Sequence, residues 1–267
     1  MRNRDRVMSE HCDLSEVDRA WLDQLIDEWS LLADLAFADL ILWVPGVDDN
    51  TFWACGQVRP TTGPTSLEDD VVGEDISYDP EHLVTEAYLS GEICHTSGNK
   101  LHAGIPVDVT AIPIMDGERC VAVVEMHTNQ MGVRAPGALE DAYLEAAQVL
   151  TGMVHHHQFP LGGERRVPWV SPRVGDGMLR VNSSGMISYA SPNAMSAYRR
   201  LGSTSDLYGE DFVAVTKSLL NERGPVERPT AAALSGRGSA EGDLESATAN
   251  VRLRVLPGRI VWDVVVP

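Results

Sequence analysis

The fold of the N-terminal half is decided by the stretch IPIMDGERCVAVV, residues 112–124. Its Asp116-Gly117 pair lies between two runs rich in β-branched residues, and in that setting the pair is a strong hairpin signal. The strand before the turn is expected over two adjacent runs, 105–111 and 112–115, and the strand after it over 120–124. An antiparallel sheet is therefore expected at the centre of this half.

Helical periodicity brackets this sheet on both sides. Apolar residues recur every three or four positions from Asp13 to Ala38, and the same spacing returns from Gly137 to His157. Asp13 is expected to cap the first helix, with Glu16 at the third helical position of a capping box. The pattern also predicts strands over 40–44 and 51–58, a loop over 59–77 and a short helix over 80–90.

Residues 160–172 are expected to form a linker, because prolines and glycines crowd into them and the charge balance changes there. Residues 1–159 carry 8 basic and 28 acidic side chains, whereas residues 160–267 carry 13 and 11. Past the linker the pattern predicts strands over 178–181, 186–189, 250–256 and 259–266, and helices over 192–201 and 226–234. The predicted fold class is α+β, with two domains over 1–159 and 173–267, each an antiparallel sheet with flanking helices.

Composition excludes several classes of function. The chain of 267 residues has a formal net charge of −18, which disfavours nucleic acids and anionic membranes as partners. No apolar stretch approaches the about 20 residues of a membrane-spanning helix, and the N-terminus does not resemble a signal peptide. Cys12, Cys55, Cys94 and Cys120 are far apart in the sequence, so free and mostly buried thiols are expected. These features together predict a cytoplasmic protein.

Several blocks of sequence resemble known sensory domains. Residues 175–181 and 185–194, which end in Ser-Pro-Asn-Ala, resemble the start of a PAS domain, and residues 207–212 resemble its later turn. Residues 28–39 and 59–65 resemble parts of a GAF domain. Together, these blocks resemble the sensor region of actinobacterial histidine kinases of the PdtaS type. The resemblance therefore implies a GAF-like domain followed by a PAS-like domain that is shortened at its end.

The resemblance implies a sensory role in a two-component system. The family consists of cytoplasmic dimeric kinases that autophosphorylate on a histidine and pass the phosphate to an RNA-binding ANTAR response regulator. The family's His-His-Arg-Val-Lys-Asn-Asn phosphoacceptor block and its ATP-binding boxes are absent from this chain. We therefore assign no catalytic residue and expect no ATPase or autokinase activity. The sequence leaves open whether the chain is the sensory fragment of a kinase or a degenerate relative.

Three hypotheses for function follow from these observations. The leading one is a sensor, in which a small ligand or redox signal at the GAF-like domain is relayed through the PAS-like domain to a kinase domain outside this chain. The second is a small-molecule redox enzyme on a GAF scaffold, which would need two of Cys55, Cys94 and Cys120 within disulfide reach. The third is a ligand-free dimerisation module. No cofactor is assigned.

A segment containing Cys94, His95 and His102 is the most interesting candidate site. Thiolate and imidazole are ligands that suit zinc and copper, and the resemblance places this loop beside the ligand pocket of a GAF domain. Only three ligands are visible, however, and a cytoplasmic loop cysteine is ordinarily inert. Whether these residues bind metal is left open, and no metal ligand is assigned.

Four other groups are interpreted more simply. The adjacent His155–His157 point about 100° apart on a helix, so they cannot converge on one ion. Glu125 and His127 share a strand face, but Glu125 ends an apolar run and is expected to be exposed. The acidic residues over 69–75 lack the regular spacing of a calcium loop. Trp53 is expected on a strand that faces the possible pocket, where it is a candidate for stacking on a ligand.

The two long helices also predict an assembly. The apolar stripe of the helix over 13–38 includes Leu14, Trp21 and Leu25, and it is wider than one sheet contact needs. The helix over 137–157 offers a complementary row with alanines that permit close approach. We expect the two helices to pack side by side and to form part of a homodimer interface, because a two-fold interface needs a self-complementary surface. The alternative is that they only cover their own sheet.

Overall fold

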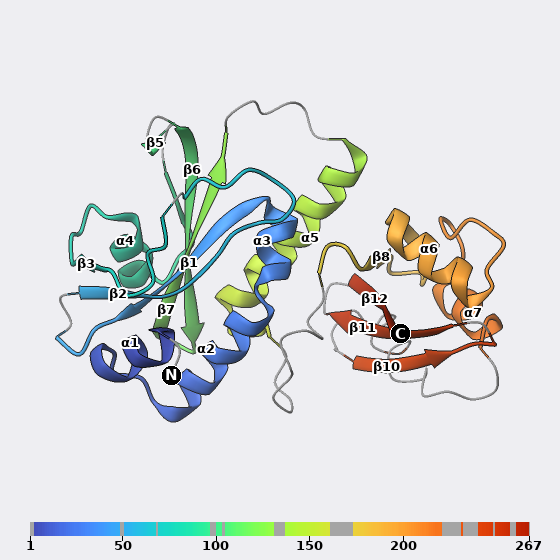
Figure 1. Ribbon diagram of the computed structural model, residues 1–267, viewed down its shortest axis with the longest axis horizontal. Helices are drawn as coiled ribbons and strands as arrows, with labels where there is room; N and C mark the ends of the chain where they lie inside the picture. Colours follow the sequence, from blue (N-terminus) through green and yellow to red (C-terminus); the bar gives the residue numbers. More distant parts are fainter. Residues whose placement is uncertain are drawn as a thin grey trace. The chain divides into compact units, whose positions relative to one another are not determined.

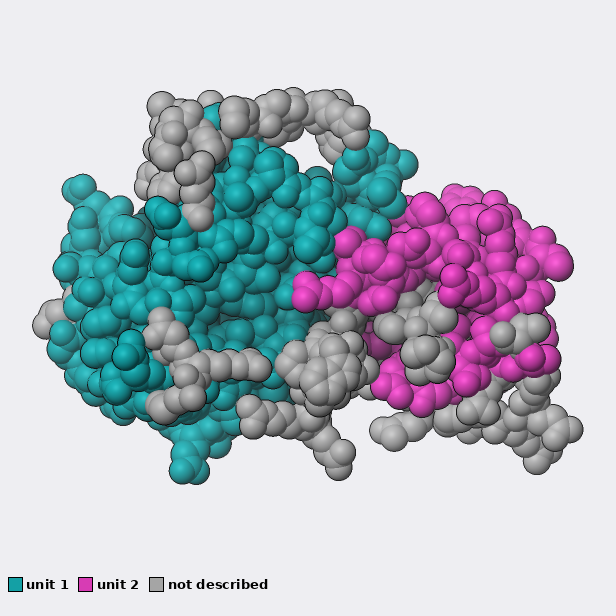
Figure 2. Space-filling view, viewed as in Figure 1, with its two compact units in different colours: residues 1–171 teal, residues 172–267 magenta. Residues whose placement is uncertain are grey.

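The computed structural model describes residues 3–48, 51–67, 69–96, 100–102, 105–130, 137–160, 173–220, 231, 240–247, 249–256 and 260–266. The chain divides into two compact units, residues 1–171 and 172–267, which Figure 2 shows in teal and magenta. The predicted linker, residues 160–172, lies outside the described residues except for Pro160. Within the described ranges, no helix has both the length and the apolar character that crossing a membrane requires.

The described part of unit 1 holds a seven-stranded antiparallel sheet in the order β3-β2-β1-β7-β6-β4, with β5 also paired to β6. Its strands are β1 (Ala38–Pro45), β2 (Thr51–Val58), β3 (Asp75–Ser77), β4 (Cys94–His95), β5 (Lys100–His102), β6 (Ile105–Asp116) and β7 (Arg119–Asn129). The predicted hairpin is confirmed, because Asp116 pairs with Arg119 across a two-residue turn. Gly117 has a φ of 65° in that turn, a conformation that glycine adopts without steric cost. The two runs predicted before the turn form one continuous strand.

The helices of unit 1 differ from the prediction at the N-terminus. They are α1 (Asn3–His11), α2 (Glu16–Glu28), α3 (Ser30–Ala36), α4 (Leu83–Ser90) and α5 (Ala138–His155). The predicted Asp13–Glu16 capping box is wrong: Ser15 caps α2, since its Oγ accepts from the Asp18 amide at 3.1 Å and donates to Asp18 Oδ2 at 2.7 Å. Helix α1 was not predicted at all.

The single helix expected over 13–38 is also wrong, because α2 and α3 meet at a break at Trp29. The Trp29 side chain is 2% exposed, and a Cβ built on Gly56 of β2 would lie 3.1 Å from the indole ring. A glycine therefore allows the ring to approach the strand closely. We attribute the break to this packing, which the apolar spacing does not encode. Val17 fits the three- and four-residue apolar spacing of the predicted helix, yet it is 76% exposed.

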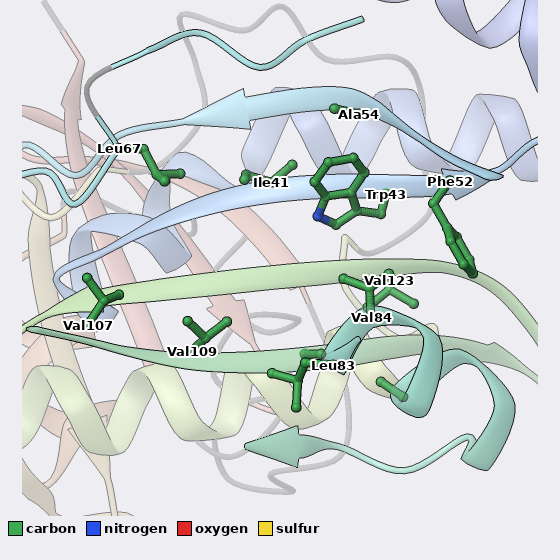
Figure 3. Packing of buried hydrophobic residues seen from close by; sticks show 12 residues of the cluster. Ile41, Trp43, Phe52, Ala54, Leu67, Leu83, Val84, Val107, Val109 and Val123 are labelled. Atoms are coloured by element: carbon green, nitrogen blue, oxygen red, sulfur yellow. The ribbon is translucent and has the colours of Figure 1, made fainter. Parts of the chain in front are cut away.

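Different helices cover the two faces of this sheet. Helices α3 and α5 pack side by side, as predicted for these two segments, and lie against β1 and β6 respectively (Figure 1). Helix α4 lies against β6 and β7 on the other side, which we call the α4 face. Figure 3 shows side chains from α4, β1, β2, β6 and β7, together with Leu67, packed on this face. Its buried cluster consists of Ile41, Trp43, Phe52, Ala54, Leu67, Leu83, Val84, Ala87, Val107, Val109, Ala111 and Val123.

Unit 2 is built in the same general way. Its described strands are β8 (Gly177–Val181), β9 (Ile187–Ala190), β10 (Ala240–Glu245), β11 (Asn250–Leu256) and β12 (Ile260–Val266), in the antiparallel order β10-β11-β12-β8-β9. Helices α6 (Pro192–Leu201) and α7 (Phe212–Ser218) pack on its core with Tyr198 and Phe212. The predicted fold class, α+β with antiparallel sheets and flanking helices, is confirmed.

One serine joins the first hairpin of unit 2 to the helix that follows it. Ser191 Oγ accepts from the Ala194 amide at 3.2 Å, which caps α6, and from the Met178 amide of β8 at 2.9 Å. Gly202 ends the helix with a φ of 112°, as its position after Leu201 predicted. Strand β10 and helix α7 were not predicted, and the helical patch expected over 226–234 lies outside the described residues except for residue 231.

Candidate functional site: a buried glutamate–histidine pair

Glu125 and His127 lie side by side on the α4 face, on the central strand β7. Glu125 is opposite Ile41 of β1, and His127 is opposite Asp39. Directly opposite residues on paired strands point to the same face, and Ile41 belongs to the cluster on the α4 face. Glu125, His127 and Asp39 thus place polar side chains beside the apolar cluster of this face.

The expectation that Glu125 is exposed is wrong. Glu125 is 7% exposed and His127 is 9% exposed. The strand continues to Asn129 and is flanked by β1 and β6, so residues that seemed to end an apolar run lie in the middle of the sheet. The structure therefore assigns this pair to the interior of unit 1.

Trp43 of β1 completes the polar centre. Its indole Nε1 donates a hydrogen bond of 2.8 Å to Glu125 Oε2, and both residues are buried. His127 Nε2 lies 3.2 Å from the same oxygen, which is an ion-pair distance. Among the described residues, neither ring nitrogen of His127 has a partner with hydrogen-bond geometry. The two ring nitrogens of this buried imidazole could therefore still form hydrogen bonds.

The pKa of the Glu125 carboxyl lies below its ordinary value. Desolvation is the largest influence and acts to raise this pKa. The close His127 imidazole, the Trp43 indole and the charge of His82 act in the opposite direction and together outweigh it. His82 is the N-cap residue of α4, so the helix that covers this face also contributes to its electrostatics. The ionised carboxylate is thus the favoured form at neutral pH.

Two buried aspartates accept hydrogen bonds from the loop that follows β2. Asp34 Oδ1 accepts from the Thr61 amide at 2.7 Å and from the Thr61 hydroxyl at 2.9 Å. Asp39 accepts from the Thr65 hydroxyl at 2.7 Å through Oδ1 and from the Ser66 amide through Oδ2. These contacts join residues 28–39 to residues 59–65, the two blocks that carried the resemblance in this half. Sequence analysis gave these aspartates no role, although an aspartate beside an apolar strand is a recognisable signal.

In the segment with Cys94, His95 and His102, the two described side chains do not converge. Cys94 and His95 are consecutive residues of β4 and so point to opposite faces. Cys94 packs against the cluster of the α4 face, and burial raises the pKa of its thiol. His95 is exposed, with Nδ1 2.9 Å from Thr110 Oγ1. His102 is in β5, and its side chain lies outside the described set. The described residues contain no group of three or more potential metal ligands.

The other candidates also have structural partners. His155 Nδ1 is 2.8 Å from the Pro113 carbonyl oxygen, and the His157 ring stacks on Trp21 at 3.9 Å between centroids. His155 and His157 thus diverge as expected, whereas the His156 ring lies 4.6 Å from the His155 ring between centroids. Trp53, the candidate for stacking on a ligand, points away from the α4 cluster, because Phe52 and Ala54 on either side of it face that cluster. Its ring stacks on His11 instead, with centroids 3.9 Å apart.

Sequence analysis missed a thiol pair outside the α4 face. Cys12 follows α1 and Cys55 lies in β2, and their sulfur atoms are 3.7 Å apart. Both are free thiols in the structure. Their separation of 43 residues along the chain left no spacing pattern that would have indicated this contact.

Comparison with known proteins agrees with this architecture. The model of the GAF domain of histidine kinase PdtaS matches residues 5–147. The sensor histidine kinases PdtaS of Mycolicibacterium smegmatis and Mycobacterium tuberculosis are 37% identical over 263 residues and 36% identical over 264 residues. Each alignment covers 94% of this chain, but only 51% and 52% of the relatives, so the chain spans about half their length.

A solved structure supports the same assignment. It is described as the sensor region of a sensor histidine kinase, and it matches with a TM-score of 0.78 and 32% identity. The match covers 98% of this chain and 95% of that one. The resemblance seen in the sequence blocks is therefore confirmed, and the chain belongs to the family of PdtaS histidine kinase GAF domains.

Proposed function

We propose that this chain is the sensory region of a cytoplasmic two-component histidine kinase, in which unit 1 receives a small-molecule signal at the Glu125–His127 centre. The observation that carries the proposal is a buried carboxylate and imidazole on the α4 face of a GAF-type unit. Buried ionisable groups with strong neighbours are typical of functional sites. The ring nitrogens of His127, which have no partner with hydrogen-bond geometry among the described residues, and the carboxylate of Glu125 suit a small polar ligand that carries both donors and acceptors.

We further propose that unit 2 is a PAS-like domain that passes the signal onward. The β8–β9 hairpin runs directly into α6, and Ser191 of the Ser-Pro-Asn-Ala segment caps that helix, which is the arrangement the resemblance implies. The receiving kinase domain would lie outside this chain, and an ANTAR response regulator would be its phosphoacceptor. The domain limits proposed remain 1–159 and 173–267.

A homodimer is the proposed assembly. Most of the predicted row on α5 is used within unit 1, since Ala142, Ala146 and Met153 are buried. Leu139 and Leu144 are 40% and 36% exposed and remain accessible for a second copy. Sedimentation velocity at micromolar concentration tests this proposal. A single species near 29.1 kDa would contradict it.

The ligand proposal is tested by extraction of small molecules from the purified chain and their detection by mass spectrometry. A molecule is expected from the wild-type chain and not from Glu125→Gln. The control is Asp243→Asn, which also replaces a carboxylate by an amide, but at a residue of unit 2 that is exposed and paired with Arg252 at 2.7 Å. Equal recovery from both variants would contradict the proposed site. No recovery from the wild-type chain, together with no thermal stabilisation by a metabolite mixture, would favour the dimerisation module.

A further inference from the structure

We propose that Cys12 and Cys55 are a peroxide-reactive thiol pair, which hydrogen peroxide converts into an intramolecular disulfide that links the end of α1 to strand β2. The inference does not rest on the proposed ligand site. It rests on the position of two sulfur atoms, on the contacts that hold them and on the different surroundings of the two thiols.

The two sulfurs are in van der Waals contact. Cys12 Sγ and Cys55 Sγ are 3.7 Å apart. A disulfide bond is about 2.05 Å long, so the sulfurs need to approach by roughly 1.6 Å to bond.

The backbone around Cys12 is held against the β1–β2 hairpin. The Val47 amide donates to the His11 carbonyl at 3.0 Å, and Cys12 forms an isolated antiparallel bridge with Gly46. The His11 ring stacks on Trp53 with an interplanar angle of 13°. These three contacts on consecutive residues fix Cys12 beside β2, so the short sulfur–sulfur distance is a feature of the packed structure.

A β-bulge places Cys55. Leu42 and Trp43 are consecutive in β1, but they pair with Gly56 and Ala54 of β2. Cys55 is therefore the additional residue between them and has no partner in this ladder. Bulges change the direction of a side chain locally and often occur at functional sites.

The two thiols have different chemical roles. The hydrogen bond with Cys55 lowers the pKa of Cys12 and, with the positive charge of Arg19, outweighs the effect of burial. The pKa of Cys55 is raised by its hydrogen bond with Cys12 and by burial. Cys12 is half-buried, whereas Cys55 is fully buried. Cys12 is thus the thiolate that meets the oxidant, and Cys55 is the resolving thiol.

The reaction is balanced with one equivalent of peroxide. The Cys12 thiolate attacks one peroxide oxygen, the O–O bond breaks, and the departing hydroxide takes a proton to become water. Cys55 Sγ then attacks the sulfur of the Cys12 sulfenic acid, the S–O bond breaks, and the hydroxyl leaves as water with the proton of the Cys55 thiol. Two thiols lose two electrons in total, and the peroxide is reduced to two waters.

The other two cysteines of the chain provide internal controls. Burial raises the pKa of the Cys94 thiol, and it raises the pKa of Cys120 to about 12. Both thiols therefore hold little thiolate at neutral pH and are expected to react slowly.

The test treats the full chain with one equivalent of hydrogen peroxide and then counts free thiols after denaturation. The wild-type chain has four cysteines and is expected to fall from four thiols to two, with dithiothreitol restoring all four. Cys94→Ser is expected to fall from three to one. Cys12→Ser, with folding confirmed by circular dichroism, is expected to retain three.

Intact mass separates the proposed product from other oxidation products. The disulfide-linked chain is lighter by about 2 Da, whereas a sulfinic acid is heavier by about 32 Da. A gain in mass, a disulfide-linked dimer on a non-reducing gel, or equal thiol loss in Cys12→Ser and wild type would each overturn the proposal.

Discussion

Replacement of Trp43 by Phe and of Glu125 by Gln, singly and together, tests whether the buried polar centre stabilises unit 1. Trp43→Phe removes the donor at 2.8 Å and leaves a buried carboxylate without it. Loss of a hydrogen bond to a charged group and the smaller ring together predict a fall in the free energy of unfolding of about 3 kcal/mol. Glu125→Gln retains an acceptor but loses the charge, which predicts a fall of about 1 kcal/mol.

The double variant is the decisive one. Once residue 125 carries no charge, loss of the indole N–H no longer leaves a buried carboxylate without its hydrogen-bond donor. The falls in the free energy of unfolding of the two single variants are therefore expected to add up to about 1–2 kcal/mol more than the fall measured for the double variant. Urea unfolding at pH 7, followed by circular dichroism, gives all four free energies.

Trp53→Phe provides the matched control for this cycle. It removes the same type of ring from the same hairpin, but Trp53 stacks on His11 and faces away from the α4 cluster. Trp53→Phe and Glu125→Gln are expected to be additive within about 0.5 kcal/mol. The reasoning is refuted if the Trp43 and Glu125 pair is additive within that same limit.

The pH dependence of the same variants gives an independent check. The folded pKa of Glu125 is lowered, so its ionised form contributes stability that is fully present above the unfolded value of about 4.3. That contribution is lost as the pH falls through the lower folded pKa. The difference in the free energy of unfolding between wild type and Glu125→Gln should therefore become smaller as the pH falls. A difference that grows on acidification would contradict the lowered pKa of Glu125.

Two further substitutions test the packing of the N-terminal helices, each by urea unfolding. Ser15→Ala removes the cap of α2 and should lower the free energy of unfolding by about 1 kcal/mol, whereas Asp13→Ala, at the position wrongly expected to cap, should have little effect. Gly56→Ala places a methyl group 3.1 Å from the buried Trp29 ring and should cost about 1–3 kcal/mol, and an unchanged stability would show that the ring moves aside freely.

The elements that sequence predicted well are those whose signal is local. The hairpin through Asp116-Gly117 carries its own turn chemistry, and the apolar spacing of α5 reports its buried face directly. The break at Trp29 has no such signal. Apolar spacing continues through it, and the buried Trp29 ring at the break packs against a distant glycine in β2.

The candidate site was harder to predict because burial at one position depends on distant segments. Glu125 and His127 were recognised as sharing a face, but α4, which covers that face, comes from residues 83–90. The contact between Cys12 and Cys55 depends on α1, which carries little apolar periodicity, and on a bulge in β2. Neither α1 nor the bulge produces a recognisable pattern in the sequence around Cys12 or Cys55.

The thiol pair and the polar centre are connected through that bulge, and this leads to a last prediction. Cys55 is next to Ala54, and Ala54 pairs with Trp43, whose indole donates a hydrogen bond to Glu125. Formation of the Cys12–Cys55 disulfide draws Cys55 toward α1, so it should shift the segment of β2 that pairs with Trp43. The coupling energy between Trp43→Phe and Glu125→Gln is therefore expected to change by about 0.5 kcal/mol or more when the chain is oxidised. An unchanged coupling energy in fully oxidised chains would show that the two sites of unit 1 act independently.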